Sequence, residues 1–181
     1  MASIAARIAF VPSLAYNIIM EKLAIRKWYN HIDENVILGA LPFRSMSKKL
    51  VEEEHVRGVV SLNEEYELRY LANSPEEWKQ LGVDAVRYTV TDMFEAPSQE
   101  ILTAGVSFME NIIKSNNGKV YVHCKAGRSR SATMVGCYLM KRYNMTPEEA
   151  VSFMKTKRPH ILLESFKIAA LETFYLNNVK K

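Results

Sequence analysis

The sequence predicts an α/β fold in which a mostly parallel central sheet is flanked by helices. Short apolar, β-branched runs alternate with longer runs of helical periodicity, which is typical of a sheet whose crossovers are helices. Two capping boxes with proline at the first helical position, which begin at Ser74 and Thr146, mark helix starts between such runs. With 181 residues, 48% of them apolar, the chain is long enough to bury the core of one such domain.

Each predicted element follows from its local composition. Strands are predicted where apolar and β-branched residues follow one another: 36–41, 56–62, 83–90 and 119–123. Helices are predicted at 47–54, 74–82, 98–115, 131–143, 146–157 and 164–177, from the two capping boxes at 74 and 146 and from the one-sided apolar spacing of 98–115 among other signals. The charged stretch 63–73 predicts a loop or a short helix. Ligand sites of such sheets lie in the loops after the carboxyl ends of the strands.

The loop after the predicted strand 119–123 carries the motif that says most about function. Arg130 stands six residues after Cys124, and the loop between them is basic and contains Gly127. A strand, a tight loop and a helix N-terminus form an anion site from backbone amides and the helix dipole. The planar guanidinium of Arg130 suits phosphate oxygens. The motif therefore predicts a phosphate cradle with Cys124 at its base.

The same surroundings favour a reactive sulfur at Cys124. A free cysteine has a pKa of about 8.5, and helix N-termini and nearby cations lower it to roughly 3.5–7.5. A thiolate that faces a bound phosphate is placed to attack phosphorus. Ser131 is predicted to hydrogen-bond the sulfur and to assist its departure, and His123 to orient the loop rather than to act as a base. The alternative is a buried structural cysteine, which is the role predicted for Cys137 on an apolar helix face.

Expulsion of an alkoxide from phosphorus also requires a proton donor. One carboxylic acid can donate that proton and later accept one from the water that attacks the intermediate. Asp92 is the leading candidate, because it stands in a loop after the strand predicted to end at Val90. Glu95 is the second candidate on the same loop, and a turn-capping role is the alternative for Asp92.

These residues resemble the cysteine-dependent phosphatases of the protein-tyrosine-phosphatase superfamily, in its dual-specificity branch. Segment 123–135, together with Glu64-Glu65-Tyr66-Glu67, is similar to the mitochondrial family that dephosphorylates phosphatidylglycerophosphate. Further matching segments lie at 28–29, 38–42, 73–74 and 76–79, so that the resemblance covers about residues 26–165. It implies a general acid at about the position of Asp92 and a pocket shaped by 64–67, although composition alone favours a solvated acidic turn for 64–67.

The predicted enzyme is a phosphoric monoester hydrolase that needs neither metal nor cofactor. The resemblance implies an anionic phospholipid substrate, phosphatidylglycerophosphate, and release of phosphatidylglycerol on the route to cardiolipin. A dual-specificity protein phosphatase and a non-catalytic phosphate-reading module are the alternatives, and the intact set of catalytic residue types argues against the module. Lys125 and Arg128 are extra cations for a head group with two phosphates, or solvated charges. The predicted catalytic residues are Cys124, Arg130, Asp92 and Ser131, and the predicted substrate-binding residues are Lys125, Ala126, Gly127, Arg128, Ser129, Glu64, Glu65, Tyr66 and Glu67.

Residues 1–27 differ from the predicted phosphatase domain at 28–181. They carry most of the net charge of +4 and contain no acidic residue before Glu21. The rest of the sequence shows no basic stripe that would indicate nucleic-acid binding. The uncharged run 8–20 is too short to span about 30 Å of hydrocarbon. A mitochondrial import signal or an anchor on the matrix side of the inner membrane is predicted, with a secretory signal and a docking helix of the domain as alternatives. Apolar residues at helical spacing support this: Ile4, Ile8, Val11, Ala15 and Ile18.

Overall fold

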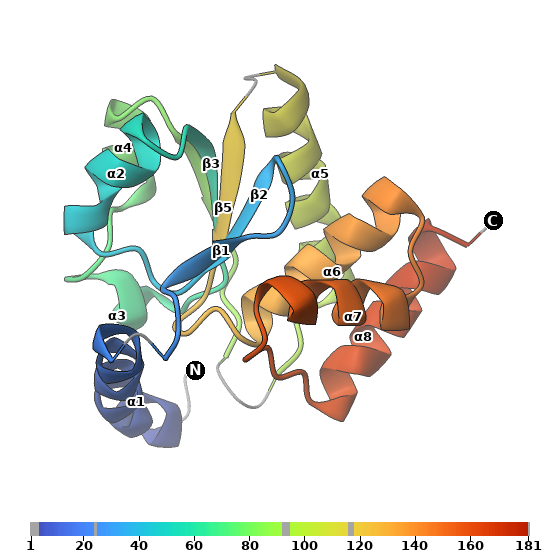
Figure 1. Ribbon diagram of the computed structural model, residues 1–181, viewed down its shortest axis with the longest axis horizontal. Helices are drawn as coiled ribbons and strands as arrows, with labels where there is room; N and C mark the ends of the chain where they lie inside the picture. The colour runs from blue at the N-terminus through green and yellow to red at the C-terminus, as the bar shows by residue number, and fades with distance from the viewer. Residues whose placement is uncertain (1–3, 24, 92–94, 116–117, 181) are drawn as a thin grey trace.

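The chain folds into three layers, with a sheet between two layers of helices (Figure 1). The computed structural model describes residues 4–23, 25–91, 95–115 and 118–180. The strands are β1 (Tyr29–His31), β2 (Val36–Gly39), β3 (Val56–Ser61), β4 (Asp84–Arg87) and β5 (Lys119–His123). The helices are α1 (Ile4–Lys22), α2 (Ser47–Glu52), α3 (Glu65–Leu68), α4 (Pro75–Gln80), α5 (Gln99–Ser115), α6 (Arg130–Tyr143), α7 (Pro147–Lys157) and α8 (Ser165–Asn178), with a 3₁₀ turn η1 at Arg44–Met46.

The sheet confirms the predicted α/β class. Its strand order is β1-β2-β5-β3-β4, and β2, β5, β3 and β4 run parallel. The edge strand β1 is antiparallel to β2 and was not predicted, because its three residues are too few to show a period. The four parallel strands bring their carboxyl ends to one edge of the sheet, where β5 ends at His123, next to Cys124.

Each face of the sheet packs against its own helices. On one face, a core that includes Val60 and Val122 of the sheet packs against α5, α6 and α8, which Figure 1 shows together on the right. On the other face, Val59 and Tyr121 pack with Leu50 of α2 and Trp78 of α4. Successive residues of a strand point to opposite faces, which accounts for the continuous apolar runs that predicted these strands. Each fully buried aliphatic or aromatic side chain contributes about 1.5–3 kcal/mol to stability.

The predicted helix starts are formed as expected. In the capping box of α4, Ser74 Oγ accepts a hydrogen bond from Glu77 N at 3.2 Å, and Glu77 Oε2 accepts one from Ser74 N at 2.7 Å. Thr146 begins α7 in the same way. A third capping box, which was not predicted, begins α3, where Glu64 is the cap and Glu67 Oε2 accepts from Glu64 N at 2.8 Å.

Helix α1 packs on the domain, near α3 (Figure 1). Phe10 and Leu14 are each 7% exposed, and they lie in a cluster with Trp28, Leu41 and Ala72. Ile8 and Val11 lie outside this contact and are exposed. Among the helices that the structure describes, none combines the length and the apolar character needed to span a membrane.

Candidate active site

The loop between β5 and α6 brings Cys124 and Ser131 together. Cys124 directly follows β5 and is buried, and Ser131 lies in the first turn of α6. Ser131 Oγ donates a hydrogen bond to Cys124 Sγ at 3.2 Å. Gly127 has a φ of +63°, and a Cβ there would lie 2.3 Å from the carbonyl oxygen of Gly39. The loop therefore requires glycine at this position, both for its backbone angle and for its close approach to β2.

The N-terminus of α6 faces this loop without a side-chain cap. Ser129 holds the cap position, but its side chain makes no capping hydrogen bond. Instead, Ser129 Oγ donates to Glu164 Oε2 at 2.9 Å. Amide groups at a helix N-terminus that lack a capping acceptor are ready donors for an anion. The backbone geometry thus suits the predicted phosphate cradle.

Arg130 is fixed at this site by a buried ion pair with Glu67. Both side chains are fully buried, with Nη1 at 2.8 Å from Oε2 and Nη2 at 2.9 Å from Oε1. Arg130 Nη1 also donates to the carbonyl oxygens of Leu62, at 3.0 Å, and of Val90, at 2.8 Å. These carbonyls follow β3 and β4, so the guanidinium is held by two strand ends and α3. The carboxylate of Glu67 thus contacts the Nη1–Nη2 edge of the guanidinium.

The acidic run 64–67 divides between two sides of α3. Glu67 contacts Arg130, whereas Glu65 lies 3.9 Å from Arg87 and is exposed. Positions two apart on a helix lie on nearly opposite sides. Tyr66 packs edge-on against Phe10 of α1, with ring centroids 5.7 Å apart. The structure therefore brings Glu67 to the predicted site as the group that positions Arg130, and it turns Glu65 toward a different pocket.

The extra cations of the loop contact its surroundings. Lys125 Nζ lies 5.9 Å from the centroid of the Phe10 ring, in a cation–π contact with α1. Arg128 Nε donates to the carbonyl oxygen of His160 at 2.9 Å, and burial lowers the pKa of Arg128. These contacts join the loop to α1 and to the segment before α8, so Arg128 is partly engaged in fastening the loop.

Arg158 was not predicted, although it binds the same loop. It is fully buried, and it donates from Nε to the carbonyl oxygen of Gly127 at 2.7 Å and from Nη2 to that of Ala126 at 3.0 Å. Burial lowers the pKa of Arg158 to about 10. In a planar trans peptide the carbonyl and the following N–H point in opposite directions. By drawing these two carbonyls outward, Arg158 turns the N–H groups of Gly127 and Arg128 toward the interior of the loop.

His123 is buried directly beside the cysteine. Burial lowers the pKa of its imidazole to about 3, although a backbone interaction with Cys124 opposes that shift, so the ring is neutral near pH 7. Cys137 lies fully buried in α6, where burial raises the pKa of its thiol well above the ordinary value. Of the two cysteines, Cys124 is thus the one that lies in the loop between β5 and α6, residues 124–129, which we call the phosphate loop.

The predicted general acid, Asp92, lies outside the described residues. The chain that leads to it does reach the site, because the carbonyl of Val90 accepts a hydrogen bond from Arg130. Glu95, the second candidate, is exposed, and its Oε2 accepts a hydrogen bond from Thr91 N at 3.3 Å.

A buried cysteine on a phosphate loop, a serine bound to its sulfur and an arginine fixed beside it are the features of a cysteine-dependent phosphatase. Residues 43–174 match the catalytic domain of the dual specificity phosphatases, so the chain belongs to this family and is a phosphoric monoester hydrolase. It is 45% identical over 173 residues to the rat phosphatidylglycerophosphatase and protein-tyrosine phosphatase 1, covering 94% of this chain and 89% of the rat protein. The human protein of that name is 46% identical over 173 residues, covering 94% of this chain and 86% of its own length. The crystal structure of PTPMT1 in complex with PI(5)P is similar, with a TM-score of 0.81, 44% identity, and coverage of 83% of this chain and 96% of that chain.

Proposed function

We propose that this chain hydrolyses phosphatidylglycerophosphate to phosphatidylglycerol and phosphate, on the route to cardiolipin. The observation that carries the phosphatase chemistry is the Ser131–Cys124 hydrogen bond in a loop at the uncapped N-terminus of α6. The names of the rat and human relatives support the lipid substrate. Those names also include protein-tyrosine phosphatase, so a phosphotyrosine substrate is the second candidate.

The proposed reaction has two steps and uses no metal. In the first, the Cys124 thiolate attacks phosphorus, an S–P bond forms, the bond from phosphorus to the lipid alkoxide breaks, and Asp92 gives that alkoxide its proton. In the second, Asp92 takes a proton from water, the water oxygen attacks phosphorus, and the S–P bond breaks. Arg130 and the loop amides bind the phosphoryl oxygens throughout, and the hydroxyl of Ser131 stabilises the departing sulfur.

A direct comparison of substrates tests the proposed preference. Phosphate release is measured from phosphatidylglycerophosphate in mixed vesicles and from a phosphotyrosine peptide, under identical salt and pH. We expect kcat/KM to be at least about tenfold higher for the lipid, which is about 1.4 kcal/mol of transition-state preference. A preference for the peptide would overturn the lipid assignment and leave the phosphatase assignment standing.

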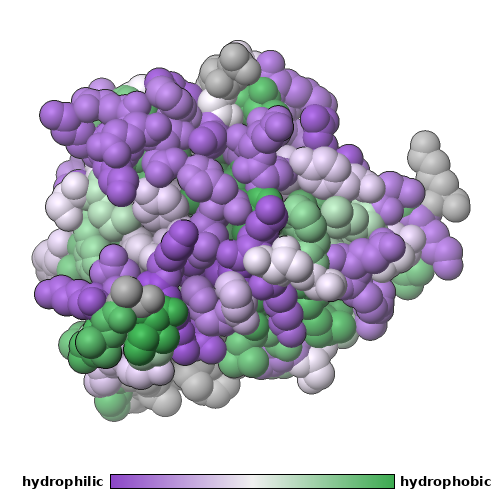
Figure 2. Space-filling view, in the orientation of Figure 1, coloured by the Kyte–Doolittle hydropathy of each residue, from purple (hydrophilic) through white to green (hydrophobic). Residues whose placement is uncertain are grey.

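We infer that α1 lies on the surface of the membrane that holds the substrate. Its outward face carries Ile8, Val11 and Ile19, which are 70%, 68% and 54% exposed, and Figure 2 shows apolar side chains gathered there. The same helix reaches the predicted site through the contacts of Phe10 with Tyr66 and Lys125. An amphipathic helix with an apolar outer face binds at the lipid interface, so this placement would bring the loop of Cys124 near lipid head groups.

We further propose that this membrane is the mitochondrial inner membrane, on its matrix side. The support is the basic, acid-poor composition of residues 1–27, which suits import and an anionic lipid surface. Fractionation of cells that express the full chain tests the location. Recovery of the protein outside the inner-membrane fraction would contradict it.

Replacing the exposed apolar face of α1 should separate membrane binding from catalysis. In the triple variant Ile8→Ser, Val11→Ser, Ile19→Ser we expect affinity for vesicles of anionic phospholipid to fall at least about tenfold, since burial of one such side chain is worth about 1.5–3 kcal/mol. Turnover of a soluble aryl phosphate should stay unchanged, because Phe10 and Leu14 still hold the helix.

The matched control for this experiment is Leu176→Ser, which removes an exposed leucine from α8. Co-sedimentation with vesicles is measured for both variants. Equal retention of the triple variant and the control on vesicles would contradict the docking role of α1.

A further inference from the structure

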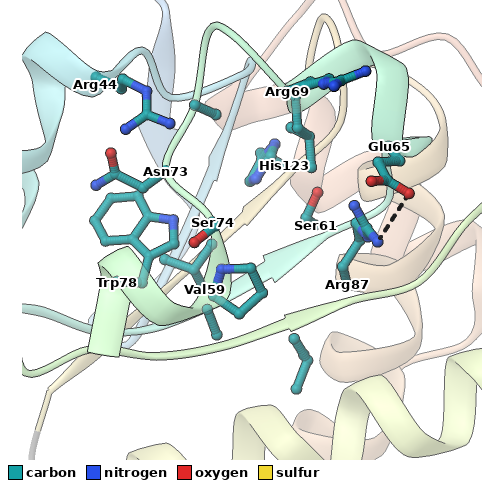
Figure 3. A pocket seen from close by; sticks show the side chains of 15 residues that line it. Arg44, Val59, Ser61, Glu65, Arg69, Asn73, Ser74, Trp78, Arg87 and His123 are labelled. Atoms are coloured by element: carbon teal, nitrogen blue, oxygen red, sulfur yellow. Dashed lines mark ion pairs between the residues drawn. The ribbon is translucent and has the colours of Figure 1, made fainter. Parts of the chain in front are cut away.

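A pocket lies beside α3, which contributes Glu65 and Leu68 to its lining (Figure 3), whereas Arg130 and Glu67 are not among the lining residues. Its volume is about 200 Å³, and it lies between α3, α4 and the carboxyl ends of β3 and β4. Cys124 is not among its lining residues. Apolar side chains line its depth, among them Val59, Leu68, Trp78 and Ala85. The pocket is therefore distinct from the phosphate loop, and its walls suit an apolar body.

The rim of this pocket is positively charged. Arg44 lies on one side of the view in Figure 3, and Arg69 and Arg87 lie on the other. Arg44 pairs with Glu77, and Arg87 is 3.9 Å from Glu65, at the outer limit of an ion pair. The guanidinium of Arg69 lies 5.3 Å from the ring of Tyr70, and within the described part of the chain it forms no ion pair. Three guanidinium groups therefore face two carboxylates, which leaves the rim with an excess of positive charge.

A buried histidine side chain lies among the arginines that line the pocket. His123 lines the pocket, is 1% exposed, and stands between the arginines in Figure 3. Its Nδ1 forms no hydrogen bond of standard geometry with another described residue, although the backbone of Cys124 interacts with the ring. Buried polar atoms in native structures are almost always satisfied. The imidazole therefore lies where it could hydrogen-bond an acidic group held by the arginines of the rim.

Two direct connections join this pocket to the phosphate loop. Helix α3 gives Glu67 to Arg130 on one side and Glu65 and Leu68 to the pocket on the other. His123, in addition, is the covalent neighbour of Cys124. A ligand that presses on α3 or bonds to His123 will change the setting of Arg130 or of the cysteine, and sites linked in this way influence each other reciprocally.

We propose that this pocket is an effector site for a small amphipathic anion, with its acidic head among Arg44, Arg69 and Arg87 and hydrogen-bonded to His123, and its apolar body against Trp78 and Ala85. Occupation of the pocket changes the affinity of the phosphate loop for oxyanions. The site takes no part in the chemistry at phosphorus, and its ligand differs from the phospholipid substrate in needing no access to Cys124.

Direct binding of a probe tests the site without any assay of the lipid substrate. Octanoate is titrated calorimetrically into the full-length protein, below its micelle concentration, with octanol as the uncharged comparison. We expect one octanoate site, no comparable octanol binding, and an affinity about tenfold weaker in Arg69→Gln, because that variant loses a charge-assisted hydrogen bond to the carboxylate. Ala85→Leu fills the pocket and should remove binding, and Lys48→Gln, an exposed change on α2, should leave binding unchanged.

Vanadate, an oxyanion that occupies the phosphate loop, tests the coupling. Vanadate should change octanoate affinity by at least about fivefold, and this change should reach a plateau once vanadate saturates its site. Octanoate should change vanadate affinity by the same factor. Octanoate binding that persists in Ala85→Leu would overturn the proposal. So would an octanoate affinity that keeps falling as the vanadate concentration rises, because this is the behaviour of two ligands that compete for one site. Absence of octanoate binding, or a coupling factor of one, would overturn it as well.

Discussion

Cys124→Ser is expected to abolish phosphate release while leaving the phosphate loop able to bind oxyanions. A serine hydroxyl is not ionised near neutral pH, so the nucleophile is lost, whereas Arg130, held by Glu67, and the loop amides remain. Loss of a nucleophile costs on the order of 10⁶ in kcat in an enzyme where it has been removed alone. Turnover of an aryl phosphate and calorimetric binding of phosphate, measured on the same preparation, check both halves of the expectation.

The matched control is Cys137→Ser, which makes the same substitution in the core of α6. It introduces a buried hydroxyl and should lower the free energy of unfolding by about 1–3 kcal/mol, with kcat close to that of the unmodified protein. Substantial turnover by Cys124→Ser would remove Cys124 from the nucleophile position. Loss of turnover in Cys137→Ser, with the fold retained, would show that activity does not distinguish the two cysteines.

The phosphate loop could be predicted because its geometry is local. Cys124, Gly127 and Ser131 lie within eight consecutive residues, so the motif alone specifies the loop, its glycine turn and the helix start. The hydrogen bond from Ser131 to the sulfur, which was expected from this spacing, is present at 3.2 Å. The strands were likewise predicted from continuous apolar runs, because parallel strands buried on both faces show that pattern.

The groups that support the loop could not be predicted in the same way. Arg158 and Glu67 contact the loop and Arg130 from 31 and 63 positions away in the chain, and neither belongs to an apolar period. Glu67 lay in a run that the family resemblance singled out, but its partner follows only from the placement of α3 beside β3 and β4. Helix α1 illustrates the same limit, because two of its faces are apolar and periodicity does not say which of them meets the domain.

The second largest effect is expected for Asp92→Asn, and it should depend on the leaving group. Tyrosine phenol has a pKa of about 10, and the alcohol of a glycerol phosphate is far more basic, so its departure depends more on a donated proton. General acid catalysis contributes about 10²–10⁴-fold. If Asp92 is the acid, we expect the variant to lose a factor in that range on phosphatidylglycerophosphate, and much less on an activated aryl phosphate, when turnover is measured where chemistry limits the rate.

Glu95→Gln is the matched control, because Glu95 stands on the same loop and is exposed, with Oε2 bound to the backbone N–H of Thr91. Its turnover ratio between lipid and aryl phosphate should stay that of the unmodified protein. Equal losses of Asp92→Asn on both substrates would mean that Asp92 only positions its loop. A shift of the ratio in Glu95→Gln instead would assign the proton to Glu95. Glu67 is not a competing candidate, because its carboxylate is bound by Arg130 and cannot reach a leaving group without releasing it.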